Sequence, residues 1–426
     1  MLGGGTFTSQ NKKIPGAYIN FVSAARADSA LSERGIVAIG MNLNWGNDTG
    51  VFLVTKEEFL KKTVQIFGYD YSSEELKQLR ELFKHATKAY LYRLNAGVKA
   101  SNDFATAKYS GTRGNDLKVV ITENADDSTK WDVSTYLGTA LVDEQTKVVD
   151  ATALKENDFV TFKKDATLAA TAGTVLAGGT NGTVTGTQHQ AFLSAMESSS
   201  FNILASDTTD APTKALYAAF TKRMREEMGV KFQTVLFGSA SDYEGVINVK
   251  NSVELISWVA GAEAGCEVNK SLTNMIYDGE YEITTSYTQS QLEDAITAGE
   301  LAFHKVGDGY RVLVDINSLI TTSSEKGVEF KNNQTIRVLD QIGNDTAALF
   351  NDKYNGKIPN DASGRISLWN DLVSYYKELE GLRAIENFDA ADIEVLKGTG
   401  KTDVVANSYV TPTNCMDKLY MTIIVQ

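Results

Sequence analysis

The apolar and polar positions of the first hundred residues predict a short α/β region. Four consecutive apolar residues at 36–39 are typical of a buried strand. Two segments with apolar residues at helical spacing and one β-like run follow this strand: 55–68, 71–86 and 88–95. Ser72 and Glu75 have the spacing of a capping box, which predicts that the second helix begins there.

The pattern changes between residues 97 and 187, where apolar and polar residues alternate with a period of two. Thr, Gly, Asp and Val are frequent, and no convincing helical pattern occurs. The strands that this alternation predicts lie within the following segments: 116–124, 131–151 and 157–164. We therefore expect a small all-β module inserted between α/β segments.

From residue 188, helical and strand-like patterns alternate at short spacing: helix 190–199, strand 201–207, helix 212–229, strand 231–238 and helix 252–265. Such an order predicts parallel βαβ units in a doubly wound sheet. Gly307, Asp308 and Gly309 separate two alternating runs and predict a hairpin. Two long helical patterns, 333–354 and 367–385, follow.

Both ends of the sequence are β-prone and extended in pattern. An extended arm of about 22 residues reaches up to roughly 70 Å, which is more than the width of a domain. Such an arm either folds back on its own body or crosses to a neighbour and adds a strand to its sheet. If the arms cross, the residues that would make subunit contacts are Thr6, Phe7, Tyr18, Ile19, Asn20, Phe21, Val22, Leu419, Tyr420, Met421, Thr422, Ile423, Ile424 and Val425.

Charge and composition limit the classes of function. The 426 residues suggest two to four domains, and 42% hydrophobic with 22% charged residues indicates a folded protein. A net charge of −13 argues against a partner such as nucleic acid or an anionic membrane. Lys12, Lys13 and Arg26 precede the first acid, so the opening arm is either a solvated basic tail or docks on an acidic body. No apolar stretch has the length of a membrane helix, and the start does not have the pattern of a secretion signal.

Metal and cofactor motifs are not evident. Cys266 and Cys415 have no CxxC partner, which predicts two free thiols made in a reducing compartment. The three histidines, His85, His189 and His304, are not spaced as metal ligands. We therefore expect no catalytic, cofactor-binding or metal residues.

Two segments are similar to enzyme motifs but depart from them. The run GTGKTD at 398–403 is similar to a phosphate loop, yet Val395 stands where the motif needs its first glycine, so a glycine-rich turn is the better interpretation. Ser239 directly follows a predicted strand, where α/β enzymes place chemistry, but it lacks the G-x-S-x-G pattern. A hydrolase that uses Asp207 or Ser239 stays as an alternative.

Several stretches resemble the contractile-tail sheath proteins of myophages and phage-tail-like bacteriocins, in the branch found in Gram-positive bacteria. They are spread over almost the whole chain: GGGTFTSQNKKIPGAYINFVSA at the start, AKYSGTRGNDLKVVI at 107–121, FTKRMREEMGVKFQTVLF and DYEGVINVKN between 220 and 251, and VTPTNCMDKLYMTIIV near the end.

This resemblance implies a multidomain α/β protein with the following parts: an N-terminal arm, 1–25; the first part of the α/β core, 26–96; an inserted β-sandwich, 97–187; a subtilisin-like α/β domain without a catalytic triad, 188–319; and an α+β inner domain that ends in a strand arm, 320–426. In this family the arms cross to adjacent subunits and complete a shared β-sheet.

The function that the resemblance implies is structural. Subunits would form hexameric rings, stack around the tail tube, and contract to drive the tube through a cell envelope without a nucleotide. The implied partners are copies of the chain itself, the tail tube protein, and baseplate and tail terminator proteins. The expected location is a virion tail or bacteriocin particle assembled in the host cytoplasm. The main alternative is another self-assembling shell protein, such as a surface-layer or capsid-like component.

Overall fold

The computed structural model describes residues 4–5, 17–18 and 31–425. Their contacts divide the chain into two compact units. The large unit contains residues 33–344, 383–386 and the chain from 412 onward, and the small unit contains residues 345–382 and 387–411 together with the described residues before 33. Residues 4–5 and 17–18 form a parallel pair of two-residue strands, β1 (Gly4–Gly5) and β2 (Ala17–Tyr18).

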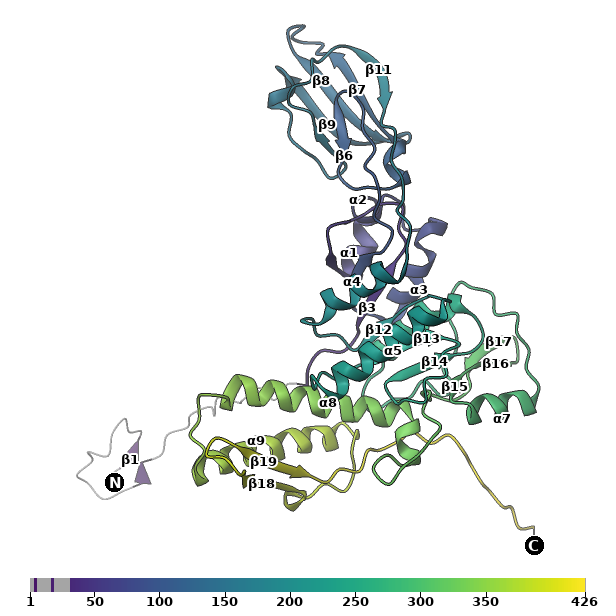
Figure 1. Ribbon diagram of the computed structural model, residues 1–426, viewed down its shortest axis with the longest axis vertical. Coiled ribbons are helices and arrows are strands. Elements are labelled where there is room, and N and C mark those ends of the chain that lie inside the picture. Colours follow the sequence, from purple (N-terminus) through teal and green to yellow (C-terminus); the bar gives the residue numbers. More distant parts are fainter. Residues whose placement is uncertain (1–3, 6–16, 19–30, 426) are drawn as a thin grey trace. The chain divides into compact units, whose positions relative to one another are not determined.

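A seven-stranded sheet forms the centre of the large unit (Figure 1). Its spatial order is β15-β14-β13-β12-β3-β5-β4, and every neighbouring pair is parallel except β4 with β5. This arrangement confirms the predicted parallel sheet. The strands are β3 (Ile36–Met41), β4 (Val51–Thr55), β5 (Lys88–Arg93), β12 (Ile203–Ala205), β13 (Gln233–Phe237), β14 (Val246–Val249) and β15 (Glu300–Leu301).

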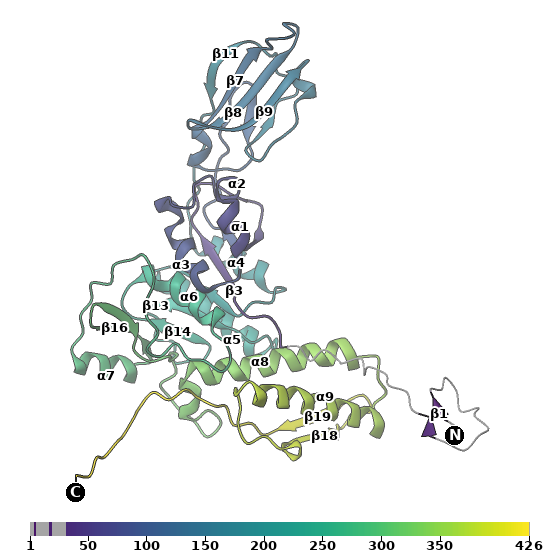
Figure 2. The same cartoon turned by 180° about the vertical axis from the view of Figure 1, so that it is seen from behind.

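Helices cover both faces of this sheet (Figures 1 and 2). Val37 and Ile39 pack with two helices on one face, whereas Ala38 between them packs with two helices on the other. Side chains that alternate between two buried faces explain why the strands are continuously apolar. The first face carries α3 (Lys77–His85) and α6 (Ile256–Gly265), and the second carries α4 (Gly186–Met196) and α5 (Ala211–Glu226).

Residues between β5 and α4 form a β-sandwich, which confirms the all-β module predicted from the alternating pattern. A four-stranded antiparallel sheet in the order β11-β7-β8-β9 encloses an apolar core together with the pair β10-β6. The strands are β6 (Ala105–Ala107), β7 (Leu117–Glu123), β8 (Trp131–Leu137), β9 (Ala140–Val148), β10 (Val160–Phe162) and β11 (Thr171–Val175).

Two chain segments lead into and out of the sandwich, and we call them the connector: residues 95–98 and 179–182. The backbone groups of Val98 and Thr180 exchange two hydrogen bonds, at 3.0 and 3.1 Å. The buried guanidinium of Arg93, at the end of β5, donates to the carbonyl oxygen of Ser110 at 2.5 Å. A Cβ atom on Gly182 would lie 2.1 Å from the Ala96 carbonyl oxygen, so the two segments are in backbone contact.

The predicted helix over 55–68 is wrong in detail, because Lys62, at φ −127° and ψ 25°, divides it into α1 (Lys56–Lys61) and α2 (Thr63–Phe67). The capping box predicted at Ser72 and Glu75 is also wrong. The chain enters α3 through a 3₁₀ turn that has no side-chain cap. A capping box occurs instead at the start of α1, between Thr55 and Glu58.

The hairpin predicted at Gly307 is confirmed. Strands β16 (Phe303–Val306) and β17 (Gly309–Val312) pair antiparallel around a two-residue turn, in which Gly307 has a φ of +61°. Helix α7 (Gln289–Thr297), just before this hairpin, and strand β14 were not predicted.

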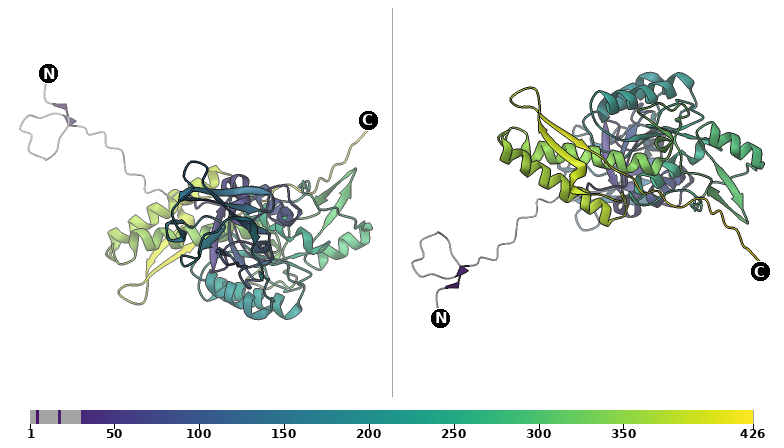
Figure 3. Two further views of the ribbon diagram at one scale, coloured as in Figure 1. Left: turned by 90° about the horizontal axis from the view of Figure 1, so that it is seen from above. Right: turned by 90° about the horizontal axis from the view of Figure 1, so that it is seen from below.

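The small unit is built on two helices and a hairpin. Helix α8 (Asn333–Leu349) continues into it as π-helical residues Phe350–Tyr354, and α9 (Ala362–Gly381) follows. Strands β18 (Ile393–Lys397) and β19 (Val404–Ser408) form an antiparallel pair beside α9 (Figure 3). The two long helical patterns in the sequence are confirmed, but this hairpin was not predicted.

Candidate assembly surfaces

The described end of the chain exposes an unusual run of apolar side chains. We call residues 416–425 the terminal segment. Its large apolar side chains from Leu419 onward are between 69% exposed, at Met421, and 90% exposed, at Val425. No strand is assigned to these described residues, so the expected strand is not formed within a single copy. Contiguous exposed apolar surface of this kind is typical of protein interaction sites.

The chain just before the terminal segment is fixed to the large unit. The side-chain N–H of Gln334 donates to the carbonyl oxygen of Thr413 at 3.0 Å, and its side-chain oxygen accepts from the backbone N–H of Cys415 at 2.9 Å. The side chains of Thr335 and Asn414 lie 3.2 Å apart and form a further hydrogen bond. The exposed apolar residues therefore extend from an anchored point on the first turn of α8.

The hairpin β18–β19 offers two strand edges to which no other described strand pairs. One face of the hairpin packs on α9, where the indole N–H of Trp369 donates to the carbonyl oxygen of Ile393 at 2.9 Å. Leu396 and Val405 are opposite each other on the other face and are about half exposed. An open edge of this kind is a template for pairing with another chain.

The outer strand of the sandwich, β9, differs from the hairpin because its edge is less open to pairing. The side-chain amide of Gln145, in β9, exchanges two 2.8 Å hydrogen bonds with the backbone of Lys155. The segment after β9 is thus held against that strand, and charged side chains such as Asp143 and Glu144 stand along it. These features are typical of edges that avoid pairing.

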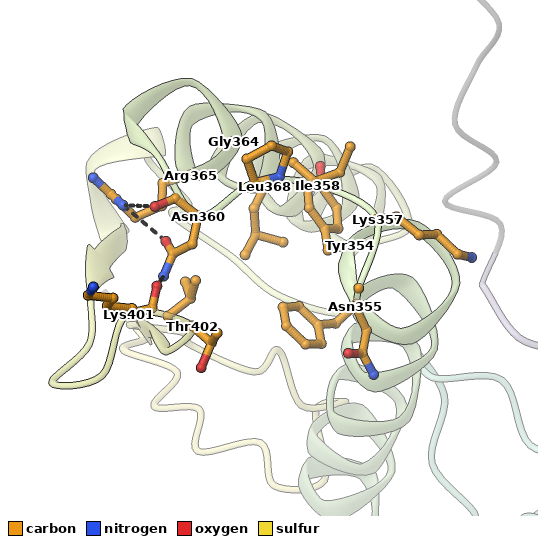
Figure 4. A pocket seen from close by; sticks show the side chains of 14 residues that line it. Tyr354, Asn355, Lys357, Ile358, Asn360, Gly364, Arg365, Leu368, Lys401 and Thr402 are labelled. Carbon is orange, nitrogen blue, oxygen red and sulfur yellow. Dashed lines mark hydrogen bonds between the residues drawn. The ribbon is translucent and has the colours of Figure 1, made fainter.

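A pocket of about 570 Å³ lies in the small unit at the turn of the hairpin (Figure 4). Its floor is apolar and includes Phe350, Ile358 and Leu368. Three cationic residues stand at its border, and none of its described lining residues carries a carboxylate. These are Lys357, Arg365 and Lys401. Figure 4 shows Arg365 and Lys401 on one side of the pocket and Lys357 on the other, extending outward.

The run GTGKTD forms the turn between β18 and β19, as the turn interpretation predicted. The backbone N–H of Gly400 donates to the Asp403 carboxylate at 2.9 Å, and the Gly398 N–H donates to the Asp403 carbonyl oxygen at 2.8 Å. The side-chain amide of Asn360 binds the turn from the α9 side, at the carbonyl oxygens of Lys401 and Asp403. These amide groups are already bonded within the turn and do not form a phosphate cradle.

A buried ionic cluster lies beneath the first turn of α8. The Arg337 guanidinium contacts the carboxylates of Glu263 and Asp315, at 2.6 and 3.2 Å, and all three side chains are at most 2% exposed. The Asn333 amide donates to both carboxylates, at 3.1 and 2.9 Å. Burial, with the Asp315 charge beside it, raises the pKa of Glu263 to about 8. Burial is also the largest single effect on Asp315 and acts in the same direction, but the Arg337 charge and the hydrogen bonds to this carboxylate together outweigh it and lower its pKa.

The candidate catalytic residues are not brought together. The Ser239 hydroxyl lies 3.0 Å from that of Ser241, and the Asp207 carboxylate accepts from the Gln78 amide at 3.2 Å. His189 is buried, with Nδ1 2.9 Å from the Tyr217 hydroxyl. Among the described residues, no cluster of His, Cys, Asp or Glu is arranged to hold a metal ion, and no helix is long and apolar enough to cross a membrane.

The N-terminal contact residues lie mostly outside the described part of the chain. Tyr18 belongs to β2, where it pairs with Gly5. The remaining predicted residues of this arm are not described: Thr6, Phe7, Ile19, Asn20, Phe21 and Val22.

Comparison with known proteins gives the family. Four family models match successive parts of the chain: the Gp18 domain III N-terminal region of tail sheath proteins at 34–94, and the β-sandwich, central and C-terminal domains of phage tail sheath proteins at 95–181, 182–318 and 325–426. The chain belongs to the phage tail sheath family. The resemblance seen in the sequence is therefore confirmed, and so is a mixed α/β fold with a β-sandwich domain.

Individual relatives agree with this assignment. The sheath is 33% identical to the phage-like element PBSX protein XkdK of Bacillus subtilis, over 99% of both chains. It is 38% identical to a sheath tail protein from Desulfitobacterium hafniense, whose crystal structure matches with a TM-score of 0.83 over 95% of this chain and 99% of that one. The contracted helical sheath of the anti-feeding prophage is 12% identical and shares the fold, with a TM-score of 0.55 over 97% and 99% of the two chains.

Proposed function

We propose that this sheath protein polymerises as stacked hexameric rings around a tail tube and contracts to drive the tube through a target cell envelope. The observation that carries the proposal is the anchored terminal segment with its exposed apolar side chains, in a chain that also presents an open-edged hairpin. Each large apolar side chain contributes about 1.5–3 kcal/mol when it is fully buried. Copies that bury this segment against one another are therefore strongly favoured over separate copies.

Strand donation is the form of contact that fits these features. An extended segment that adds to a sheet edge forms main-chain hydrogen bonds, and alternate side chains supply the specificity. We propose that the hairpin β18–β19 of one copy receives arm strands from neighbouring copies. Main-chain hydrogen bonds of this kind persist while the compact parts of the subunits rotate, because the chain segments next to the arms absorb the change in φ and ψ. The energy for contraction is stored in the extended assembly, and no nucleotide takes part.

The parts of the chain have separate proposed roles. The large sheet and its helices, in segments 26–96 and 188–319, correspond to a subtilisin-like core without catalytic function. The sandwich at 97–187 faces outward, and residues 320–426 face the tube. The proposed partners are further copies, the tube protein, the baseplate and the tail terminator, and assembly takes place in the host cytoplasm.

Electron microscopy of negatively stained particles tests the proposal. The full chain, expressed with its tube protein, is expected to form striated hollow tubes, and a variant that lacks residues 1–22 is expected to remain as folded single copies. Flat or closed arrays would favour a surface-layer or capsid-like shell instead. Unchanged tubes from the deletion variant would rule out the role of the N-terminal arm. Any hydrolase turnover abolished by Ser239→Ala or Asp207→Ala would contradict a purely structural role.

A further inference from the structure

The pocket at the turn of β18–β19 is lined by residues from four separate places in the small unit. Phe350 and Tyr354 come from the π-helical end of α8, and their rings stack with centroids 6.4 Å apart. Leu368 comes from α9, and Val404 is the first residue of β19. Ile358, on the loop between the helices, is 43% exposed. A concave apolar site of this kind is suited to hold an apolar side chain of a partner.

The position of the pocket relates it to the hairpin edge. Residues opposite each other in an antiparallel pair share a face, so Val404 is on the same face as Lys397. With a period of two, Ile393 is also on this face, and Ile393 is buried beside Trp369 of α9. The pocket thus lies at the turn end of the hairpin, on the side that faces α9. A strand added to the hairpin would direct every second side chain toward that side.

The terminal segment has one face that fits such a site. In an extended chain, its odd-numbered side chains share a face, and from position 419 onward all four are apolar. Asp417 precedes them on the same face and is the segment's only acid. The even-numbered face is mixed, because it includes Lys418 and Thr422. In the structure the large apolar side chains of the segment are exposed.

The charges of the two arms indicate which arm is the better occupant of the pocket. The pocket border carries three cations and its described lining carries no acid. Residues 1–27 carry three cations and no acid, so their approach is disfavoured. The terminal segment brings Asp417 toward this border and apolar side chains toward the floor. Like-charge contact therefore argues against the N-terminal arm, whereas the terminal segment has one acid and one base and carries no net charge.

We propose that this pocket receives an apolar side chain from the odd-numbered face of the terminal segment of a second copy. The inference rests on the proposed strand donation and deepens it, because it adds a side-chain socket that fixes the register of the donated strand. A strand that slips by one residue would present its mixed face to the pocket. The pocket thus gives the assembly a means to select one register.

Disulfide scanning in assembled particles tests this proposal. Two differently tagged copies, both carrying Cys415→Ser, are expressed together with the tube protein. One copy carries Thr402→Cys or Ile358→Cys at the pocket, and the other carries a single cysteine at one position from 419 to 425. After mild oxidation, non-reducing gels measure the cross-linked dimer. Val306→Cys, at a residue of β16 that is 43% exposed, replaces the pocket cysteine in the matched control.

We expect at least one odd-numbered position to give a dimer band tenfold stronger than that of any even-numbered position, and the control to give none. Equal bands at odd and even positions would overturn the proposal. The proposal would also be overturned if tubes form but no position cross-links to either pocket cysteine. That result would not contradict the proposed strand donation. If the parent protein forms no tubes with its tube protein, the proposed function fails first, and the pocket inference fails with it.

Discussion

The side-chain oxygen of Gln334 accepts a hydrogen bond from the backbone N–H of Cys415 at 2.9 Å, while the N–H group of the same amide donates to Thr413. One glutamine on the first turn of α8 therefore holds both sides of Asn414. Directly beyond this point the side chains become exposed and apolar. Any pull on the terminal segment is transmitted to α8, whose first turn is itself tied to the buried ionic cluster through Asn333 and Arg337.

Replacement of this glutamine should loosen the anchor. Gln334→Ala removes two hydrogen bonds worth about 1 kcal/mol each. We expect amide exchange around residues 413–415 to accelerate by about tenfold or more in hydrogen–deuterium exchange mass spectrometry, and tube formation to weaken. Gln190→Ala, at an exposed glutamine of α4, is the control. Unchanged exchange in Gln334→Ala would show that the anchor is held by other contacts.

A charge in the terminal segment should block assembly without unfolding the monomer. Ile423 is 74% exposed, so Ile423→Asp is expected to change the free energy of unfolding by less than about 0.5 kcal/mol. Burial of that charge in a subunit interface is strongly unfavourable, and tubes should not form. Val328→Asp, at a residue 72% exposed, is the matched control and should leave tube formation intact. Electron microscopy and urea unfolding provide the two measurements, and normal tubes from Ile423→Asp would contradict the role of the segment.

The raised pKa of Glu263, about 8, predicts a pH dependence of stability. The folded protein keeps this carboxyl protonated above the pH at which the unfolded chain releases the proton. Stability from this group is therefore full below pH of about 4.5 and is lost as the pH rises to about 8, by up to about 1.4 kcal/mol per pH unit. The neighbouring Asp315, whose pKa is lowered, affects stability only at more acidic pH.

Urea unfolding at pH 5.5, 6.5 and 7.5 measures this effect. Glu263→Gln keeps an uncharged oxygen beside Arg337 and should remove most of the slope. Glu267→Gln, at an exposed residue shortly after Glu263 in the sequence, should retain the slope of stability with pH. The same slope in Glu263→Gln and in the parent would show that another group carries the pH dependence.

The close backbone contact in the connector predicts that adding a side chain at Gly182 destabilises the folded protein. Gly182→Ala would place a Cβ atom 2.1 Å from the Ala96 carbonyl oxygen, and overpacking of this kind costs about 1–3 kcal/mol. Gly186→Ala is the control, because a Cβ atom there meets no atom within 4 Å. Thermal unfolding should show a lower midpoint for Gly182→Ala alone. Equal midpoints would indicate that the two segments separate at little cost.

Short sequence patterns predicted much of the fold, because the strands and turns that they specify depend mainly on neighbouring residues. The apolar run at 36–39 is buried between two helical layers, and the glycine-flanked turn at Gly307 forms the expected hairpin. The capping box at Ser72 failed because a 3₁₀ turn takes the place of the first helical turn. Strand β14 was missed because no helix separates it from β13, so the alternation of strand and helix did not apply there.

The assembly site was only partly predictable. The β-like run at residues 419–425 is visible in the sequence, and these residues were identified from it. The pocket and the buried cluster were not, because each brings together residues far apart in the chain. Glu263, Asp315 and Arg337 are separated by 74 positions or fewer, yet nothing in their local sequence indicates that they share one buried site.

The paired backbone of the connector has a consequence for the evolution of this sheath. The insertion starts and ends at hydrogen-bonded neighbours, Val98 and Thr180, so its two ends leave the host domain side by side. Insertions at such closely spaced ends are tolerated because they add little strain to the host domain. We therefore expect the β-sandwich to tolerate changes of length at its outer turns while the core keeps its sequence.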